Sequence, residues 1–129
     1  MTKSRQVTHT VQIQQDPVDL VWKAKPVRIQ PRPPSMKEKL KYKPQKPGDL
    51  YVKKGDKVIF EPIGTDVAIL VPFEDLFGER DLGIVKNGDT LEVEVDKNLK
   101  EDAYPYSVFC FEPWVYAEGG SPPEIIVEP

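Results

Sequence analysis

Polar and apolar residues alternate along several short stretches of the chain, which is the pattern of half-buried β-strands. The clearest case is the stretch where Leu91, Val93 and Val95 alternate with acidic residues. Further stretches of strand character are 8–13, 50–52, 57–60, 67–71, 104–111 and 125–127, and 27–29 has the pattern of an edge strand. No long helical pattern occurs, and 73–81 is predicted as a loop or a single helical turn. We therefore predict an all-β protein, a Greek-key β-sandwich of seven or eight strands.

The length of 129 residues fits one domain, and we predict a single domain over 1–129. Hydrophobic residues make up 39% and charged residues 30%, which is typical of a globular protein. The segment 31–47 differs because it is rich in proline and lysine. We interpret it as a surface loop, with a proline-rich ligand for another domain as the alternative.

Apolar runs in this sequence are too short for a membrane-spanning helix, which needs roughly 20 residues. The first six residues are polar and contain no apolar signal segment. We therefore expect no membrane partner, and the compartment stays open, with a cytoplasmic location as the sequence is written. Export stays open if the chain is part of a longer precursor.

Charge is distributed unevenly between the two halves of the chain. Residues 1–57 contain 14 Lys and Arg against 5 Asp and Glu, whereas 58–129 contain 4 against 16. Such polarity can mark a nucleic-acid-binding arm, here the basic stretch 23–46, on an acidic body. A nucleic-acid module usually has a basic surface over the whole domain. We therefore consider nucleic acid an unlikely partner and expect the halves to neutralise one another within the sandwich.

Four segments, in their order and spacing, resemble the cupredoxins, the β-sandwich family of small blue copper proteins. Segment 52–60 (VKKGDKVIF) resembles the family's strand entered through Gly-Asp, and 86–93 (KNGDTLEV) resembles its Gly-x-Thr turn and strand. Segment 104–110 (YPYSVFC) resembles the aromatic strand that delivers the copper thiolate, and 125–127 resembles the closing strand. The similarity covers about three fifths of the chain and implies a cupredoxin-like β-sandwich.

The copper ligands of the family are largely missing. A blue-copper site needs two histidines, one cysteine and a weak axial donor such as methionine. The resemblance places the first histidine just before the strand at 67–71, where this chain has Thr65 or Asp66. The other histidine and the axial donor should follow Cys110, but 112–121 contains no histidine, methionine or glutamine. We therefore predict no cofactor and no type 1 copper, with an electron-transfer or copper-handling protein using an atypical site at Cys110 as the alternative.

Catalytic chemistry finds little support in the sequence. Cys110, the single cysteine, shares a strand face with Tyr106 and Val108, and free cysteine is among the most buried residue types. A reactive thiolate or a Ser-His-Asp set would need a nearby base, and the single histidine, His9, is remote in sequence. We predict an inert core cysteine and a protein that is not an enzyme.

Aromatic residues in two loops form the candidate binding site, which consists of Trp114, Tyr116, Phe73 and Phe77. Aromatic side chains are effective anchors of protein interfaces because they are large and have few rotamers. The resemblance implies that partners dock at the end of the sandwich where the copper loop lies. We therefore predict a metal-free cupredoxin-like domain that acts as a protein-interaction or structural module, with another protein as its partner.

The two loops, 72–80 and 112–121, are expected to face the same end of the sandwich, where they would form an apolar patch with an acidic rim. The opposite role for Trp114 is that it folds inward and fills the position of the missing metal. We slightly favour this inward position, because an empty cavity is costly.

Overall fold

The structure, a computed structural model, describes residues 6–28, 33–34, 48–71, 74–78, 81–118 and 123–128. The strands in these ranges are β1 (Thr8–Gln15), β2 (Trp22–Pro26), β3 (Leu50–Lys53), β4 (Lys57–Pro62), β5 (Val67–Leu70), β6 (Asp81–Val85), β7 (Leu91–Glu94), β8 (Ala103–Pro105), β9 (Ser107–Cys110), β10 (Val115–Tyr116) and β11 (Glu124–Glu128). One helical turn, α2 (Glu74–Phe77), follows β5, in agreement with the prediction for this segment. Apart from Pro33 and Pro34, the predicted loop 31–47 lies outside the described residues.

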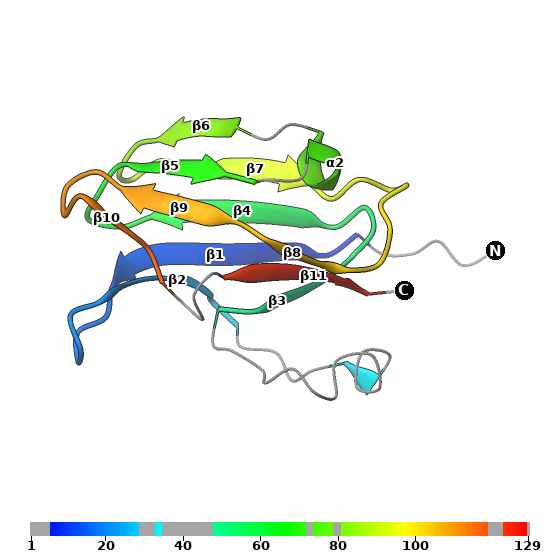
Figure 1. Cartoon of the computed structure of the whole chain (residues 1–129), viewed down its shortest axis with the longest axis horizontal. Coiled ribbons are helices and arrows are strands. Elements are labelled where there is room, and N and C mark those ends of the chain that lie inside the picture. Colours follow the sequence, from blue (N-terminus) through cyan, green and yellow to red (C-terminus); the bar gives the residue numbers. More distant parts are fainter. Residues whose placement is uncertain are drawn as a thin grey trace.

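The strands form three hydrogen-bonded sheets, in the orders β2-β1-β4-β7, β10-β9-β5-β6 and β3-β11-β8. Two pairs are parallel, β1 with β4 and β3 with β11, and the others are antiparallel (Figure 1). The predicted all-β sandwich is confirmed. The described part contains eleven short strands instead of seven or eight, in part because the stretch 104–111 is divided at Tyr106, where β8 ends and β9 begins in another sheet.

The first edge strand lies earlier than predicted. It is β2, which pairs with β1 from Gln15↔Trp22 to Val11↔Pro26, whereas Val27 is an exposed bend. The turn between the strands is closed by Asp16, whose backbone N–H donates to the carbonyl of Val21. Because this turn is short, β2 begins at Trp22, and its last residue paired with β1 is Pro26.

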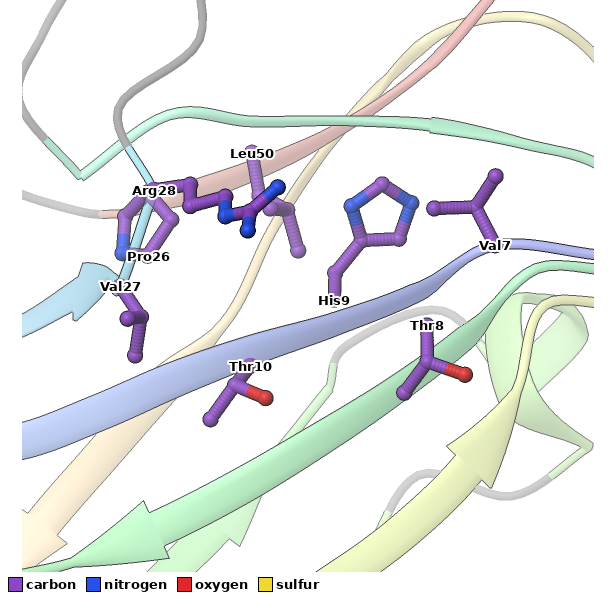
Figure 2. Close-up of a pocket in the computed structure, with 8 residues that line it drawn as sticks. All are labelled: Val7, Thr8, His9, Thr10, Pro26, Val27, Arg28 and Leu50. Atoms are coloured by element: carbon purple, nitrogen blue, oxygen red, sulfur yellow. The ribbon is translucent and has the colours of Figure 1, made fainter.

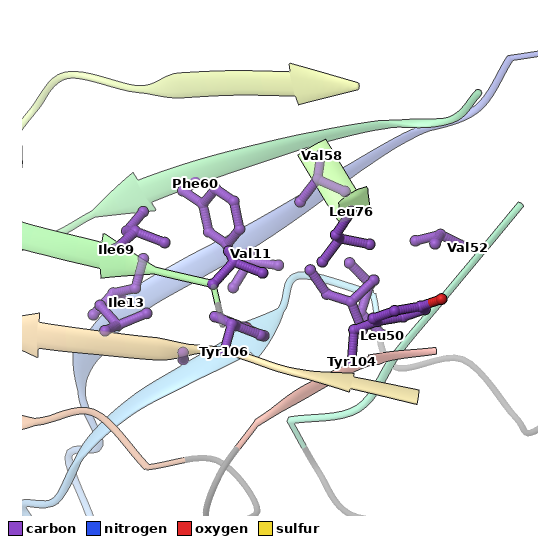
Figure 3. Close-up of a cluster of buried hydrophobic side chains, with 14 of the residues drawn as sticks. Val11, Ile13, Leu50, Val52, Val58, Phe60, Ile69, Leu76, Tyr104 and Tyr106 are labelled. Carbon is purple, nitrogen blue, oxygen red and sulfur yellow. The ribbon is translucent and has the colours of Figure 1, made fainter. Parts of the chain in front are cut away.

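The hydrophobic core lies between the sheets and draws residues from β1 to β11. Its largest fully buried members include Phe60 and Tyr106, whose rings meet in a T-shaped contact with centroids 5.7 Å apart (Figure 3). Successive side chains of a strand point to opposite faces, and this decides which of them enter the core. On β9, Val108 and Cys110 are buried while Ser107 and Phe109 are half-buried. Strand β9 therefore turns one face toward the core and the other toward solvent. The β3-β11-β8 sheet differs, because consecutive residues of β11 are buried and Tyr51 and Ile126 form a second, smaller cluster.

Strands of the basic first half lie beside strands of the acidic second half, as expected from the charge distribution. Two ion pairs between described residues link the halves: Lys54 Nζ lies 2.7 Å from Glu101 Oε1, and Lys57 Nζ lies 3.6 Å from Glu92 Oε1. No helix within the described ranges is long and apolar enough to cross a membrane.

Candidate functional site

Four aromatic side chains gather on the solvent side of the β10-β9-β5-β6 sheet. Phe109 is at their centre, with ring centroids 4.9 Å from Trp114, 5.1 Å from Tyr116 and 5.4 Å from Phe111, all in edge-to-face contacts. Trp114 is 71% exposed and Tyr116 is 60% exposed, although both pack against Phe109. The cluster thus holds two large aromatic side chains in fixed positions at the surface.

The strand register extends this cluster across the whole sheet. Tyr116 on β10 pairs with Phe109 on β9, Phe109 pairs with Ala68 on β5, and Ala68 pairs with Ile84 on β6. Ile84 is 65% exposed. Residues that pair in register point to the same side of a sheet. We call the resulting surface the outer apolar face, and it consists of Ala68, Ile84, Phe109, Phe111, Trp114 and Tyr116.

Trp114 does not fill the position of the missing metal, so the inward orientation favoured from the sequence is wrong. Its residue has φ +58°, a left-handed conformation in the turn that leads from β9 into β10. The indole is largely exposed and lies on the solvent side of the sheet, against Phe109. A different tryptophan packs against the core at this end: Trp22, at the start of β2, whose ring lies over Gly64 in the β4–β5 loop. Sequence reasoning missed Trp22 because its segment had no clear pattern.

Phe77 lies at the opposite end of the sandwich from Trp114, contrary to the prediction that their loops share an end. The register pairs Val67 with Cys110 and Leu70 with Ser107, so β5 ends where β9 begins. The helical turn α2 that follows β5 is therefore far from the turn after Cys110 (Figure 1). Phe77 is half-buried and packs edge-on against Phe60, with centroids 6.3 Å apart. Phe73 lies outside the described residues.

Cys110 is fully buried, and its neighbours across the sheet are Val67 and Val115. Burial in this apolar setting raises the pKa of its thiol to about 11. The predicted face shared with Tyr106 and Val108 is confirmed, because all three side chains are buried. A thiol with a raised pKa is a poor nucleophile and a poor metal ligand at neutral pH.

Thr65 is one of the two residues, with Asp66, to which the resemblance gives the place of the first copper histidine. It is buried, and its hydroxyl accepts a hydrogen bond from the Glu112 N–H (3.0 Å) while donating one to the Asp66 carbonyl (2.8 Å). The Phe111 N–H also donates to the Asp66 carbonyl. The loop before β5 and the turn after Cys110 are therefore joined by hydrogen bonds.

The residues present do not fit a type 1 copper centre. The chain's single histidine, His9, lies at the start of β1 and is hydrogen-bonded to Asp56, whereas β9 delivers Cys110 to the other end of the sandwich (Figure 1). Within the described ranges, no three His, Cys, Asp or Glu side chains gather as a metal site would require. No described neighbour of Cys110 supports the alternative of copper handling at this thiol.

No family model matches the chain, and no curated protein matches it in sequence. Among solved structures, it is similar to a purple cupredoxin from Nitrosopumilus maritimus, with a TM-score of 0.49, 14% identity and coverage of 92% of this chain and 98% of that one. It is also similar to a reduced amicyanin variant, with a TM-score of 0.41, 19% identity and coverage of 63% and 70%. A reduced Cu(I) amicyanin variant gives a TM-score of 0.41, 15% identity and coverage of 98% and 86%. Nothing about a ligand or an activity of this chain follows from similarities of this size. The strand orders show a β-sandwich, and similarities of this size do not establish a family for the chain.

Proposed function

We propose that this protein is a metal-free binding module that recognises another protein through its outer apolar face. The observation that carries the proposal is the 71% exposure of Trp114 on a sheet face whose paired row is apolar from Tyr116 to Ile84. Exposed apolar residues that are contiguous, unlike scattered ones, are typical of interaction surfaces. Binding, and not catalysis, is the role that this surface supports.

The geometry of Trp114 suits an interface anchor. Its ring is braced by Phe109 and Phe111, so little rotamer freedom remains to be lost on binding. A bulky residue at φ +58° is uncommon, and backbone strain of this kind tends to persist where function needs a particular orientation. Tryptophan is also among the residues most enriched at interface hot spots.

Acidic residues border the same surface. Glu112 precedes Trp114 in the β9–β10 turn, Glu118 follows Tyr116, and both are exposed. The partner that complements this surface carries an apolar patch flanked by basic side chains, because complementary charges steer association and exclude wrong partners.

A comparison of two exposed positions tests the proposal. The wild type, Trp114→Ala and Val18→Ala are each used to capture proteins from the source cells, and captured proteins are then purified and titrated directly. Val18 is 90% exposed in the β1–β2 turn and serves as the matched control. We expect a partner whose affinity falls roughly 30-fold with Trp114→Ala and is unchanged with Val18→Ala.

Thermal melting of the three proteins separates binding from folding. Because Trp114 is mostly exposed, Trp114→Ala should melt close to the wild type. Equal binding by Trp114→Ala and the wild type would overturn the proposal, as would a loss of binding explained by a large fall in melting temperature.

A further inference from the structure

A second candidate site lies at the other end of the sandwich from Trp114, beside the start of β1. It is a pocket of about 400 Å³ whose lining includes His9, Arg28, Pro26, Val27 and Leu50 (Figure 2). The pocket uses none of the residues of the outer apolar face, so it is independent of the proposed function.

His9 is held in this pocket by a buried carboxylate. Its Nε2 lies 2.9 Å from Oδ2 of Asp56, and both side chains are almost fully buried. Asp56 also accepts hydrogen bonds from the N–H of Lys53 (2.9 Å) and the N–H of Val7 (3.1 Å), and an ionised carboxylate can only accept. In neutral His9, Nε2 must therefore carry the proton, which leaves Nδ1 with its lone pair as a hydrogen-bond acceptor.

Nδ1 has no hydrogen-bond partner among the described residues. In Figure 2 the ring nitrogen away from Val7 is on the side of His9 where the guanidinium of Arg28 lies. Arg28 is exposed and has no ion-pair partner within the described ranges, so its donors are available. One pocket is thus lined by both a fixed hydrogen-bond acceptor and a permanent positive charge.

We propose that this pocket binds a small carboxylate that carries a hydroxyl group. The carboxylate pairs with Arg28, and the hydroxyl donates its hydrogen to Nδ1 of His9. Arginine matches a carboxylate through two parallel hydrogen bonds. The apolar part of the ligand lies against Pro26, Val27 and Leu50. Hydrogen phosphate offers the same combination of negative charge and O–H donor without the apolar part.

Lactate and propionate form a matched pair of probes, because they differ by one hydroxyl group. The only histidine of the chain gives imidazole NMR signals that need no further assignment. With the imidazole neutral, we expect lactate to shift these signals saturably and propionate to bind at least roughly tenfold more weakly, since a site built around a hydroxyl rejects its absence. Phosphate is titrated in parallel. If phosphate binds more tightly than lactate, the contact with Pro26, Val27 and Leu50 adds no affinity. That result would overturn the assignment of a carboxylate ligand.

Two variants test the role of Arg28. Arg28→Gln should lose lactate binding, whereas Lys25→Gln should retain it, because Lys25 is not among the described residues that line the pocket and its Nζ is 3.6 Å from Asp16. The proposal is overturned if lactate and propionate bind equally, if Arg28→Gln binds like the wild type, or if neither acid shifts His9 more than sodium chloride does. It is also overturned if Nδ1 carries the proton in the free protein.

Discussion

The indole of Trp22 packs over Gly64. A Cβ at position 64 would lie 3.3 Å from Cη2 of Trp22, and Gly64 has φ +88°, a conformation that favours glycine. The next residue is Thr65, whose hydroxyl is bonded to the turn after Cys110. The Trp22–Gly64 contact therefore ties the start of β2 to the end of the sandwich that carries Trp114.

Gly64→Ala should lower the free energy of unfolding by more than backbone strain alone accounts for. Gly88→Ala is the matched control, because Gly88 has φ +87° and no atom within 4 Å of an added Cβ. We expect Gly88→Ala to lower the free energy of unfolding by about 1 kcal/mol through backbone strain, and Gly64→Ala to lower it further. Urea unfolding of both variants measures the difference, and equal losses would show that the contact with Trp22 adds nothing.

Tyr106→Phe should leave the protein as stable as the wild type or stabilise it by up to about 1 kcal/mol. The Tyr106 hydroxyl is buried without a hydrogen-bond partner among the described residues. Burial, with a further contribution from the negative charge of Asp49, raises the pKa of Tyr106 far above its usual range.

Tyr104→Phe is the comparison for this variant. Its hydroxyl donates a 2.6 Å hydrogen bond to the Lys100 carbonyl, so its removal should cost about 1 kcal/mol. Urea unfolding curves give both values. A loss for Tyr106→Phe as large as that for Tyr104→Phe would contradict the absence of a partner at Tyr106.

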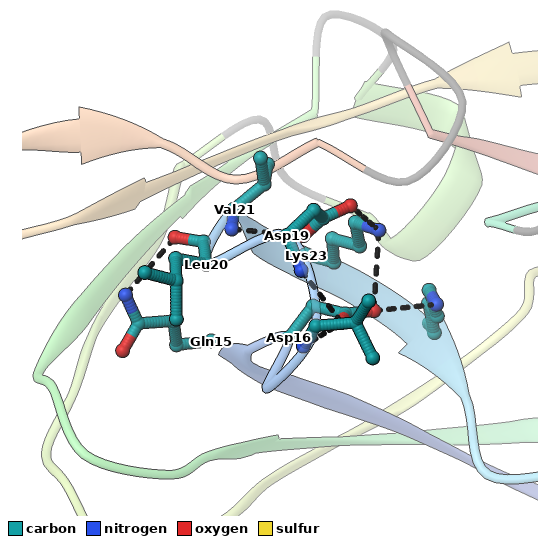
Figure 4. A network of polar contacts seen from close by, with 8 residues as sticks. Gln15, Asp16, Asp19, Leu20, Val21 and Lys23 are labelled. Carbon is teal, nitrogen blue, oxygen red and sulfur yellow. Dashed lines mark hydrogen bonds and ion pairs between the residues drawn. The ribbon is translucent and has the colours of Figure 1, made fainter.

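Asp16 should stabilise the fold at neutral pH and lose this effect in acid. Its carboxylate accepts a hydrogen bond from the Val18 N–H and another from Lys23, and these lower the pKa of Asp16 from 3.8 to about 2 (Figure 4). Because the folded pKa lies below the unfolded one, the contribution is complete above pH 3.8 and disappears as the pH falls toward 2.

Melting temperatures across this pH range check the effect. The difference between the wild type and Asp16→Asn should shrink from above pH 3.8 down to about pH 2. In Lys23→Gln, NMR should show the Asp16 carboxyl titrating at a higher pH than in the wild type, although below 3.8, because the hydrogen bond from Val18 stays. A pH-independent difference would contradict this account.

Cys110 should resist thiol reagents until the protein unfolds. The side chain is fully buried, and its pKa of about 11 keeps it protonated at neutral pH. We expect no reaction of the native protein with a disulfide reagent, complete reaction in denaturant, and no intense visible absorption on adding Cu(II). Rapid labelling of the native protein, or a stoichiometric coloured copper complex, would revive the alternative of a metal site at Cys110.

Local patterns were sufficient to predict the all-β architecture, a loop or single helical turn within 73–81, and the buried face of the Cys110 strand. These follow from alternation with period two, which each segment carries by itself. The number of histidines likewise limits copper binding in any fold. The edge strand was misplaced by a few residues, since the start of β2 depends on how the preceding turn closes.

The position of each aromatic side chain was decided by tertiary structure alone. Whether Trp114 points inward depends on the backbone of the turn after β9, and whether Phe77 lies near it depends on the direction in which β5 runs beside β9. The pairing of His9 with Asp56 joins residues 47 positions apart. The amino-acid sequence therefore determined which faces of the strands are apolar. Strand register and direction, which arise from contacts distant in sequence, determined which of these residues meet.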